Sequence, residues 1–275
     1  MKIIWTIDID DENYFEPNHN AMPVIWKEKL FYAFETVDKT NIDENGLYRT
    51  KIVVLEINPN CGDVSKKEYS FSQNQTKGKI VRPSDWKFIT GISQLQLNAG
   101  ILFNISQSQI QSIEEQLELE TFSIKSEYNF GNRVLKYNQR SKLECFDSVT
   151  HKLVWTTKLK GYLYTEIEQK DKLIFFGTAG NGGAFYCIDI ENGDVLTEYN
   201  NGDASNYAWS NNNIIIRDKK GNLTEINSRN GKEIQLLKLI DKISFYAPIL
   251  VNENKVFIRT FNKQENKPKL ICVEI

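Results

Sequence analysis

One short pattern recurs along the chain, and this repetition constrains the fold more than any single residue does. Each copy consists of an apolar run, an acid or amide, a short turn and a second run. The copies lie about 40 residues apart, and the first gap is about twice as long, which leaves room for a degenerate copy. The copies are KIVVLEINPNCGDV, SKLECFDSVTHKLVW, AFYCIDIENGDVL, NLTEINSRNGKEI and PKLICVEI. Their acid or amide is Asn58, Asp147, Asp189, Asn227 and Glu274.

Each copy is typical of a β-hairpin. Apolar and aromatic residues alternate with polar ones, and Asn-Gly at 192–193 and 230–231 is a signal for a tight turn. An Asp or Asn before such a turn accepts hydrogen bonds from backbone NH groups two residues further on. Two more β-like runs precede the hairpins, as in GYLYTEIE and KLIFFGTA. Four strands in about 40–45 residues is the size of one propeller blade.

The sequence therefore predicts an all-β fold, a single β-propeller domain of four-stranded blades that spans residues 1–275. The spacing of the copies gives six blades, and seven is the alternative if residues 65–100 contain another one. Helical periodicity is scarce. Residues 107–119 are the one candidate helix, and we assign them to strands of the degenerate blade.

The two ends of the sequence look like the two halves of one hairpin. LICVEI at 270–275 resembles a first strand, and KIIWTID at 2–8 resembles a second strand. Joining them would place Trp5 close to the position that Trp155 has in an intact copy. An open ring would leave two unpaired strand edges, which promote aggregation. We therefore expect Met1–Asp8 to pair antiparallel with Lys269–Ile275 and to close the ring.

The copy CFDSVTHKLVW resembles the repeat of quinoprotein-type (PQQ-like) β-propellers, in which Ala-x-Asp-x-x-Thr-Gly-Lys-x-x-Trp locks one blade to the next. The matching residues are Asp147, Thr150, Lys152 and Trp155, and the differing ones are Cys145 and His151. The resemblance implies the propeller fold. The dehydrogenases of this family carry adjacent cysteines beside a quinone and a calcium held by carboxylates, which this sequence does not show. We therefore place it in the noncatalytic branch.

Cys187 raises the question of whether the chain is an enzyme. Aligned on their turns, the copies place five residues in the same slot, namely Glu56, Cys145, Cys187, Glu225 and Cys272. A slot shared by a repeat indicates blade packing, where a small, soft side chain fits between sheets. The sequence near Cys187 supplies no base or cation that would lower its pKa. We therefore expect no catalytic residue.

Other motifs do not indicate a cofactor or metal site. GTAGNGGAF at 177–185 leads into a strand rather than the helix of a phosphate-binding loop, so we assign it to a hairpin loop. NIDENG at 41–46 begins like a calcium loop, but Ile52 stands where the bidentate glutamate belongs. His19 and His151 have no neighbouring nucleophile motif, and the four cysteines form no CxxC pair. We expect no cofactor and no metal.

Composition and charge narrow the class of partner. The chain is 40% hydrophobic and 25% charged, with a net charge of −2, so bulk electrostatics do not favour nucleic-acid binding. No apolar stretch approaches the roughly 20 residues of a membrane span. The first residues lack the apolar segment of a signal peptide. Together with unpaired cysteines, this predicts a cytoplasmic protein that binds neither nucleic acid nor membrane.

Acidic and aromatic residues gather in two segments. Residues 8–20 would cross from the closing blade to the next one, and a long loop at 36–50 would join the middle strands of that next blade. Because strands alternate in direction, both segments should emerge on one side, which we call the acidic face. Its residues are Asp8, Asp10, Asp11, Glu12, Tyr14, Phe15, Glu16, Asp38, Asp43, Glu44 and Tyr48.

Solvated charge is the default interpretation of the acidic face, and a docking surface for a basic protein is the alternative. Carboxylates would steer the encounter and aromatic residues would anchor it. The leading hypothesis is a noncatalytic, protein-binding β-propeller, for instance an immunity protein that neutralises a toxin, or another stoichiometric inhibitor or scaffold. The second hypothesis is an enzyme or small-ligand binder that holds a sugar or a quinone in the central pore.

Overall fold

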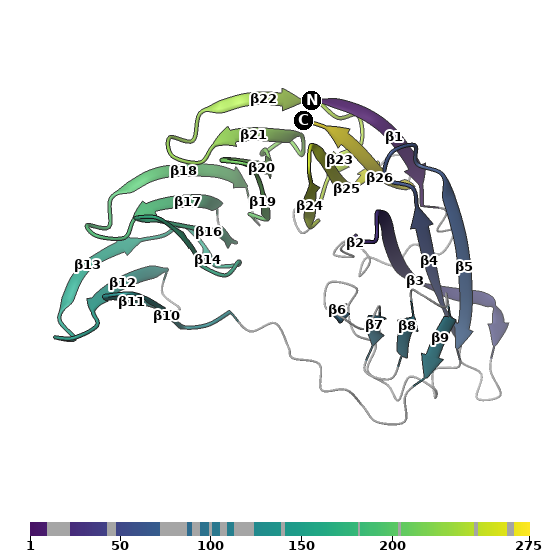
Figure 1. The fold of residues 1–275 in the computed structure, drawn as a ribbon, viewed down its shortest axis with the longest axis horizontal. Coiled ribbons are helices and arrows are strands. Elements are labelled where there is room, and N and C mark those ends of the chain that lie inside the picture. Colours follow the sequence, from purple (N-terminus) through teal and green to yellow (C-terminus); the bar gives the residue numbers. More distant parts are fainter. Residues whose placement is uncertain are drawn as a thin grey trace. The chain divides into compact units, whose positions relative to one another are not determined.

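The computed structural model describes residues 1–9, 23–42, 48–71, 87–89, 94–98, 101–104, 109–112, 124–138, 141–180, 182–202, 205–244, 247–262 and 267–275. These residues form strands and contain no helix, which confirms the all-β prediction. The chain divides into two compact units (Figure 1). The first unit comprises Met1 and Ser123–Glu253, and the second comprises Lys2–Phe122 and Asn254–Ile275.

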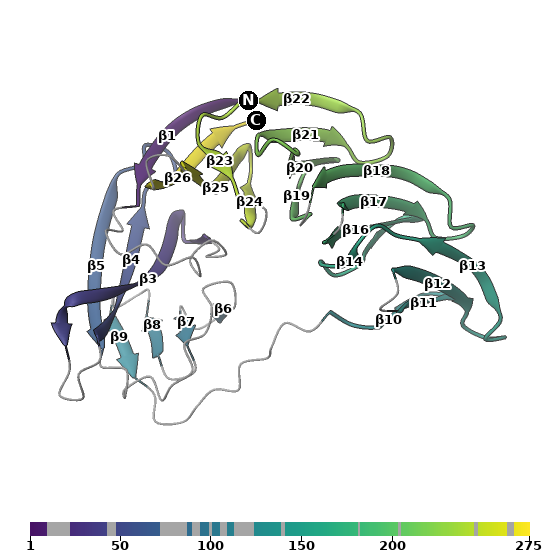
Figure 2. The same ribbon diagram turned by 180° about the vertical axis from the view of Figure 1, so that it is seen from behind.

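The first unit contains three antiparallel sheets, which we name after their last strands. The β13 sheet is made of β10 (Glu127–Phe130), β11 (Arg133–Asn138), β12 (Lys142–Asp147) and β13 (Leu153–Lys158). The β18 sheet is made of β14 (Tyr162–Leu163), β15 (Glu168–Lys170), β16 (Leu173–Ala179), β17 (Gly183–Asp189) and β18 (Val195–Gly202). The β22 sheet is made of β19 (Tyr207–Ser210), β20 (Asn213–Arg217), β21 (Leu223–Asn227) and β22 (Glu233–Leu237). Two short strands follow, β23 (Lys242–Ile243) and β24 (Ile249–Asn252). In both views the last strands lie on the outer side of this unit (Figures 1 and 2).

The second unit also contains three sheets of antiparallel strands. The first is made of β2 (Val24–Trp26), β3 (Lys29–Ile42), β4 (Tyr48–Ile57) and β5 (Val64–Phe71). The second is made of β6 (Lys87–Ile89), β7 (Gln94–Asn98), β8 (Ile101–Asn104) and β9 (Gln109–Ser112), so part of the candidate helix at 107–119 is a strand, as predicted. The third contains β1 (Lys2–Asp8), β26 (Lys267–Glu274) and β25 (Lys255–Asn262), with β26 between the other two.

The pairing of β1 with β26 confirms the expectation about the two ends of the sequence. Lys2 lies opposite Glu274, and Asp8 lies opposite Lys269. Trp5 lies opposite Cys272, and Trp155 lies opposite Cys145 in the same way. The described strands form six sheets. Closure into a ring, the number of blades and a single domain over residues 1–275 stay predictions.

The acid or amide begins the same turn in four of the five copies. Its side-chain oxygen accepts a hydrogen bond from the NH group two residues further on, at 2.9 Å for Asn58, 3.1 Å for Asp147, 2.8 Å for Asp189 and 3.0 Å for Asn227. Hydrogen bonds from Thr150 hold the pKa of Asp147 below its usual range. The fifth residue of each turn has a positive φ, which glycine adopts readily. These residues are Gly62, His151, Gly193 and Gly231.

Candidate functional site

The acidic face lies mostly outside the described residues. Asp8 is described and is exposed at the end of β1. Asp38 lies opposite Arg49 in the pairing of β3 with β4, and Tyr48 lies opposite Ile42. The members outside the described residues are Asp10, Asp11, Glu12, Tyr14, Phe15, Glu16, Asp43 and Glu44. The face as a binding surface therefore stays a prediction.

The predicted loop at 36–50 is too long. It does join the middle strands of its sheet, β3 and β4, as predicted. However, β3 continues to Ile42 and β4 already begins at Tyr48, so most of the predicted loop is a paired hairpin. The segment 36–42 is polar, but it is rich in β-branched residues and has no glycine or proline. β-branched side chains favour extended backbone even without apolar neighbours, which explains the difference.

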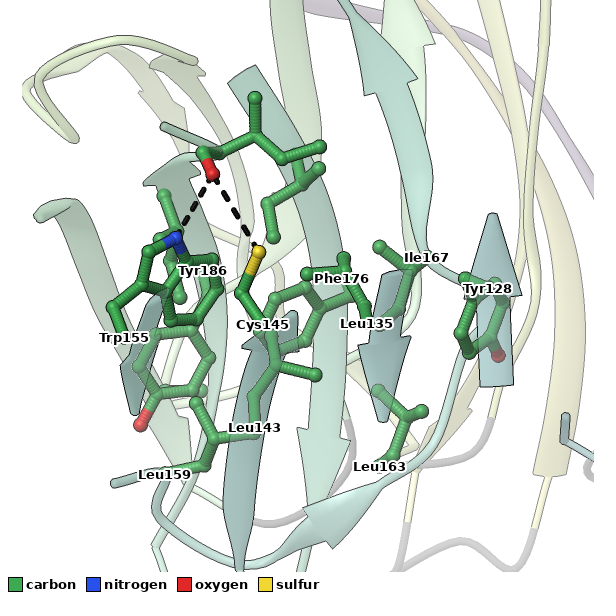
Figure 3. Packing of buried hydrophobic residues seen from close by; sticks show 14 residues of the cluster. Tyr128, Leu135, Leu143, Cys145, Trp155, Leu159, Leu163, Ile167, Phe176 and Tyr186 are labelled. Atoms are coloured by element: carbon green, nitrogen blue, oxygen red, sulfur yellow. Dashed lines mark hydrogen bonds between the residues drawn. The ribbon is translucent and has the colours of Figure 1, made fainter. Parts of the chain in front are cut away.

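The contacts that the structure does define join one sheet to the next, and we call each such contact a joint. In the Trp155 joint, the indole of Trp155 in β13 reaches the turn after β17 (Figure 3). Its Nε1 donates to the carbonyl oxygen of Ile190 at 2.9 Å, and Cys145 Sγ points at the same oxygen from 3.9 Å. The indole covers Gly193, where a Cβ would come within 2.7 Å of the ring. Trp155 is 8% exposed, so the joint is almost closed to water.

The second unit repeats this arrangement in the Trp5 joint. Trp5 Nε1 donates to the carbonyl oxygen of Pro59 at 3.0 Å, and Cys272 Sγ lies 3.9 Å from the same oxygen. A Cβ on Gly62 would come within 2.8 Å of the indole. A tryptophan, a cysteine and a glycine thus make the same contact in each of the two units. This confirms that the cysteine slot serves packing at these positions.

A third joint is built with a smaller side chain. Thr197 of β18 lies opposite Cys187, in the position that Trp155 has opposite Cys145. Its hydroxyl donates to the carbonyl oxygen of Ser228 at 3.3 Å, and its methyl group lies over Gly231. We call this contact the Thr197 joint. Threonine fills much less volume than tryptophan, but its methyl group would still lie 2.8 Å from a Cβ on Gly231.

The three buried cysteines of the slot have thiols that are hard to deprotonate. Burial raises the pKa of the Cys187 thiol to about 12 and that of the Cys145 and Cys272 thiols to about 11. At neutral pH these side chains are therefore protonated, and a thiol is a far weaker nucleophile than a thiolate. Glu225 occupies the slot in the β22 sheet, where its carboxylate accepts a hydrogen bond from Asn213 at 2.8 Å.

A thiol titration checks this description. All four cysteines are free, but Cys145, Cys187 and Cys272 are buried and Cys61 is exposed. We expect one rapidly reacting thiol in the folded protein and four after denaturation, measured with an aromatic disulfide reagent at neutral pH. Cys61→Ser should abolish the rapid reaction. Rapid labelling of Cys187 in that variant would contradict its packing role.

No group of three or more His, Cys, Asp or Glu side chains among the described residues is arranged to hold a metal ion. They also include no helix of the length and apolarity that crossing a membrane requires. His151, one of the two histidines, sits in a turn with a φ of 55° and replaces the glycine of the repeat, as the sequence predicted.

A family model described as "Outer membrane protein assembly factor BamB" matches residues 111–275. BamB from Moraxella catarrhalis aligns over 98% of this chain and 99% of its own, with 9% identity and a TM-score of 0.40. The computationally designed protein Ika4 aligns over 56% of this chain and 93% of its own, with 18% identity and a TM-score of 0.38. The computationally designed Ika8 aligns over 91% of this chain and 70% of its own, with 13% identity and a TM-score of 0.39. No curated protein sequence matches.

The strand pairings and the family match together show the fold of a PQQ-like β-propeller. The match begins in β9 and extends through Ile275, so it includes the Trp155 and Thr197 joints. The repeat, its turns and its tryptophan contact are those that the resemblance to PQQ-like propellers led us to expect. This chain belongs to the BamB family of PQQ-like β-propellers.

Proposed function

We propose that this chain is a noncatalytic β-propeller that acts by binding another protein. The observation that carries the proposal is the position of its most reactive residue type. Cys145, Cys187 and Cys272 are buried in the repeat slot, and burial raises the pKa of each thiol. The description of the matching family supports the proposal, because an assembly factor acts on other proteins.

The specific form that we propose is a stoichiometric inhibitor or scaffold, for instance an immunity protein that neutralises a toxin in the cytoplasm. Four cysteines without a disulfide support a reducing compartment. The acidic face supports a partner with a basic surface, because opposite charge accelerates encounter and discriminates against acidic proteins. Asp8 of that face is exposed at the end of β1.

The proposal is tested by affinity capture from a native lysate with the full chain as bait. The test variant is Asp10→Lys, Asp11→Lys and Asp43→Lys. The matched control reverses three exposed acids elsewhere, at Glu127, Asp194 and Glu253. We expect the test variant to capture the partner at least about tenfold less well, and the control to capture it normally. Failure of the native chain to capture any protein would contradict the proposal, and equal capture by both variants would exclude the acidic face.

A further inference from the structure

In the Trp155 joint, the positive charge of an arginine is balanced by carboxylates from both sheets. Arg133, the first residue of β11, lies 3.5 Å from the carboxylate of Asp147 in its own sheet. It also forms a hydrogen-bonded ion pair with Glu191 in the turn of the β18 sheet. The Arg133 side chain is 14% exposed, so this cation fills the space beside the turn and has an anion from each sheet.

The Thr197 joint has the same two positions with different residues. Leu173 takes the place of Arg133, because each begins its strand opposite the first residue of the turn. Arg229 takes the place of Glu191, because each lies two residues after that turn residue and donates its NH group to it. The Thr197 joint therefore has no counterpart of the ion pair between Arg133 and Glu191. Its positive charge belongs to Arg229, a residue of the turn.

A pocket of about 230 Å³ lies in this joint. Phe175, which is buried, and Leu173, which is half-buried, give its lining an apolar part. Ser228 and the amides of Asn213 and Asn227 give it a polar part. The sequence did not indicate this pocket, because its existence depends on which residues face each other across two sheets.

The charge of the lining is positive. Lys170 and Arg229 carry a positive charge and Asp171 carries a negative one. Lys170 is held in place, with its Nζ 2.8 Å from the Asn212 side-chain oxygen and 5.1 Å from the centre of the Trp209 ring. Arg229 is exposed, and its positive charge lowers the pKa of Cys187, although burial raises that pKa more. No described carboxylate forms an ion pair with Arg229.

The size of the pocket distinguishes between two sources of a bound anion, a small metabolite and an acidic side chain of a partner protein. Pockets for small molecules usually measure about 300–1,000 Å³, so this one is too small for a typical metabolite. It has room for one acidic side chain and part of an apolar neighbour. We propose that the pocket receives a Glu or Asp side chain from a partner protein, whose carboxylate pairs with Arg229 while an adjacent apolar side chain contacts Leu173 and Phe175. This inference rests on the proposed protein-binding function.

Trp209 is a reporter for the pocket in the full chain. Its ring centre lies 4.8 Å from that of Phe175, and its indole NH donates to Glu168 at 2.6 Å. The chain has five tryptophans, so Trp209→Phe assigns the indole signal in a nitrogen-15 NMR spectrum. Titration with N-acetylglutamate N-methylamide should shift this signal with saturation, at a Kd on the order of 1 mM.

Two comparisons isolate the charge. N-acetylglutamine N-methylamide has nearly the same shape without the charge, and it should bind at least about tenfold more weakly. Arg229→Gln should lose the preference for the glutamate probe, while Lys232→Gln, in the same turn but outside the pocket lining, should retain it. Equal shifts with both probes, or an unchanged preference in Arg229→Gln, would overturn the inference.

A third comparison tests the source of the carboxylate. The peptide acetyl-Leu-Glu-Leu-amide should bind about tenfold more tightly than free glutarate, because its apolar side chains add buried area. Equal affinity would overturn the choice of a protein segment. Capture of the partner that Arg229→Glu does not weaken would also overturn the inference while protein binding stands. If the native chain captures no partner, the proposed function fails, and the inference fails with it.

Discussion

Replacing Trp155 by alanine is expected to lower the free energy of unfolding by about 3–5 kcal/mol. The indole is almost fully buried, and it covers Gly193 in the neighbouring sheet. Its removal leaves a cavity between two rigid sheets that cannot collapse around it, and the Ile190 carbonyl loses its 2.9 Å donor. Urea unfolding followed by far-ultraviolet circular dichroism measures the change without relying on tryptophan fluorescence.

Trp155→Phe separates packing from hydrogen bonding at this position. Phenylalanine retains most of the buried ring but has no NH group, so we expect a loss of only about 1–2 kcal/mol. A loss below about 1 kcal/mol for Trp155→Ala would show that the Trp155 joint does not hold the two sheets together.

Gly193→Ala is expected to cost about 2–5 kcal/mol for two separate reasons. Gly193 has a φ of 77°, which costs an L-residue about 1–2 kcal/mol. The added Cβ would also lie 2.7 Å from a carbon of the Trp155 ring, and overpacking of this kind costs about 1–3 kcal/mol. The same urea experiment measures the sum.

Gly131→Ala is the matched control for the backbone contribution. Gly131 also has a positive φ, 59°, but a Cβ there would have no atom within 4 Å. It should therefore cost only about 1–2 kcal/mol. In a Trp155→Ala background, Gly193→Ala should cost no more than this control, because the overpacking partner is gone. A full cost in that background would show that the ring and the glycine are not coupled.

Much of the fold could be predicted because the copies of the repeat share their turn residues and their strand register. Asp147, Asp189 and Asn227 share one turn chemistry, so the position of one predicted the rest. Trp5 and Trp155 share one register, which predicted the pairing of β1 with β26. The prediction was wrong where a segment had no counterpart, as in the hairpin of β3 and β4, whose polar residues were interpreted as a loop.

The candidate site was harder to predict because its residues deviate from the repeat. No motif in the sequence marks Leu173 or Arg229, which line the pocket. Their role becomes visible only because the neighbouring joint has an ion pair, Arg133 with Glu191, at the same two positions. The acidic face was predicted from two segments rich in acidic and aromatic residues and from the alternating direction of the strands. Only Asp8 among its residues has a side chain that the structure describes.

The pairing of β1 with β26 has a consequence for synthesis on the ribosome. Lys2 pairs with Glu274, so β1 is translated long before β26, its partner in the sheet. While the chain grows, the apolar side of β1, including Trp5, has no β26 to pack against. This sheet therefore cannot complete its pairing before β26 has been translated, and its long sequence separation makes it slow to form relative to the local hairpins. We expect a chaperone to bind β1 of the nascent chain until β26 has been translated.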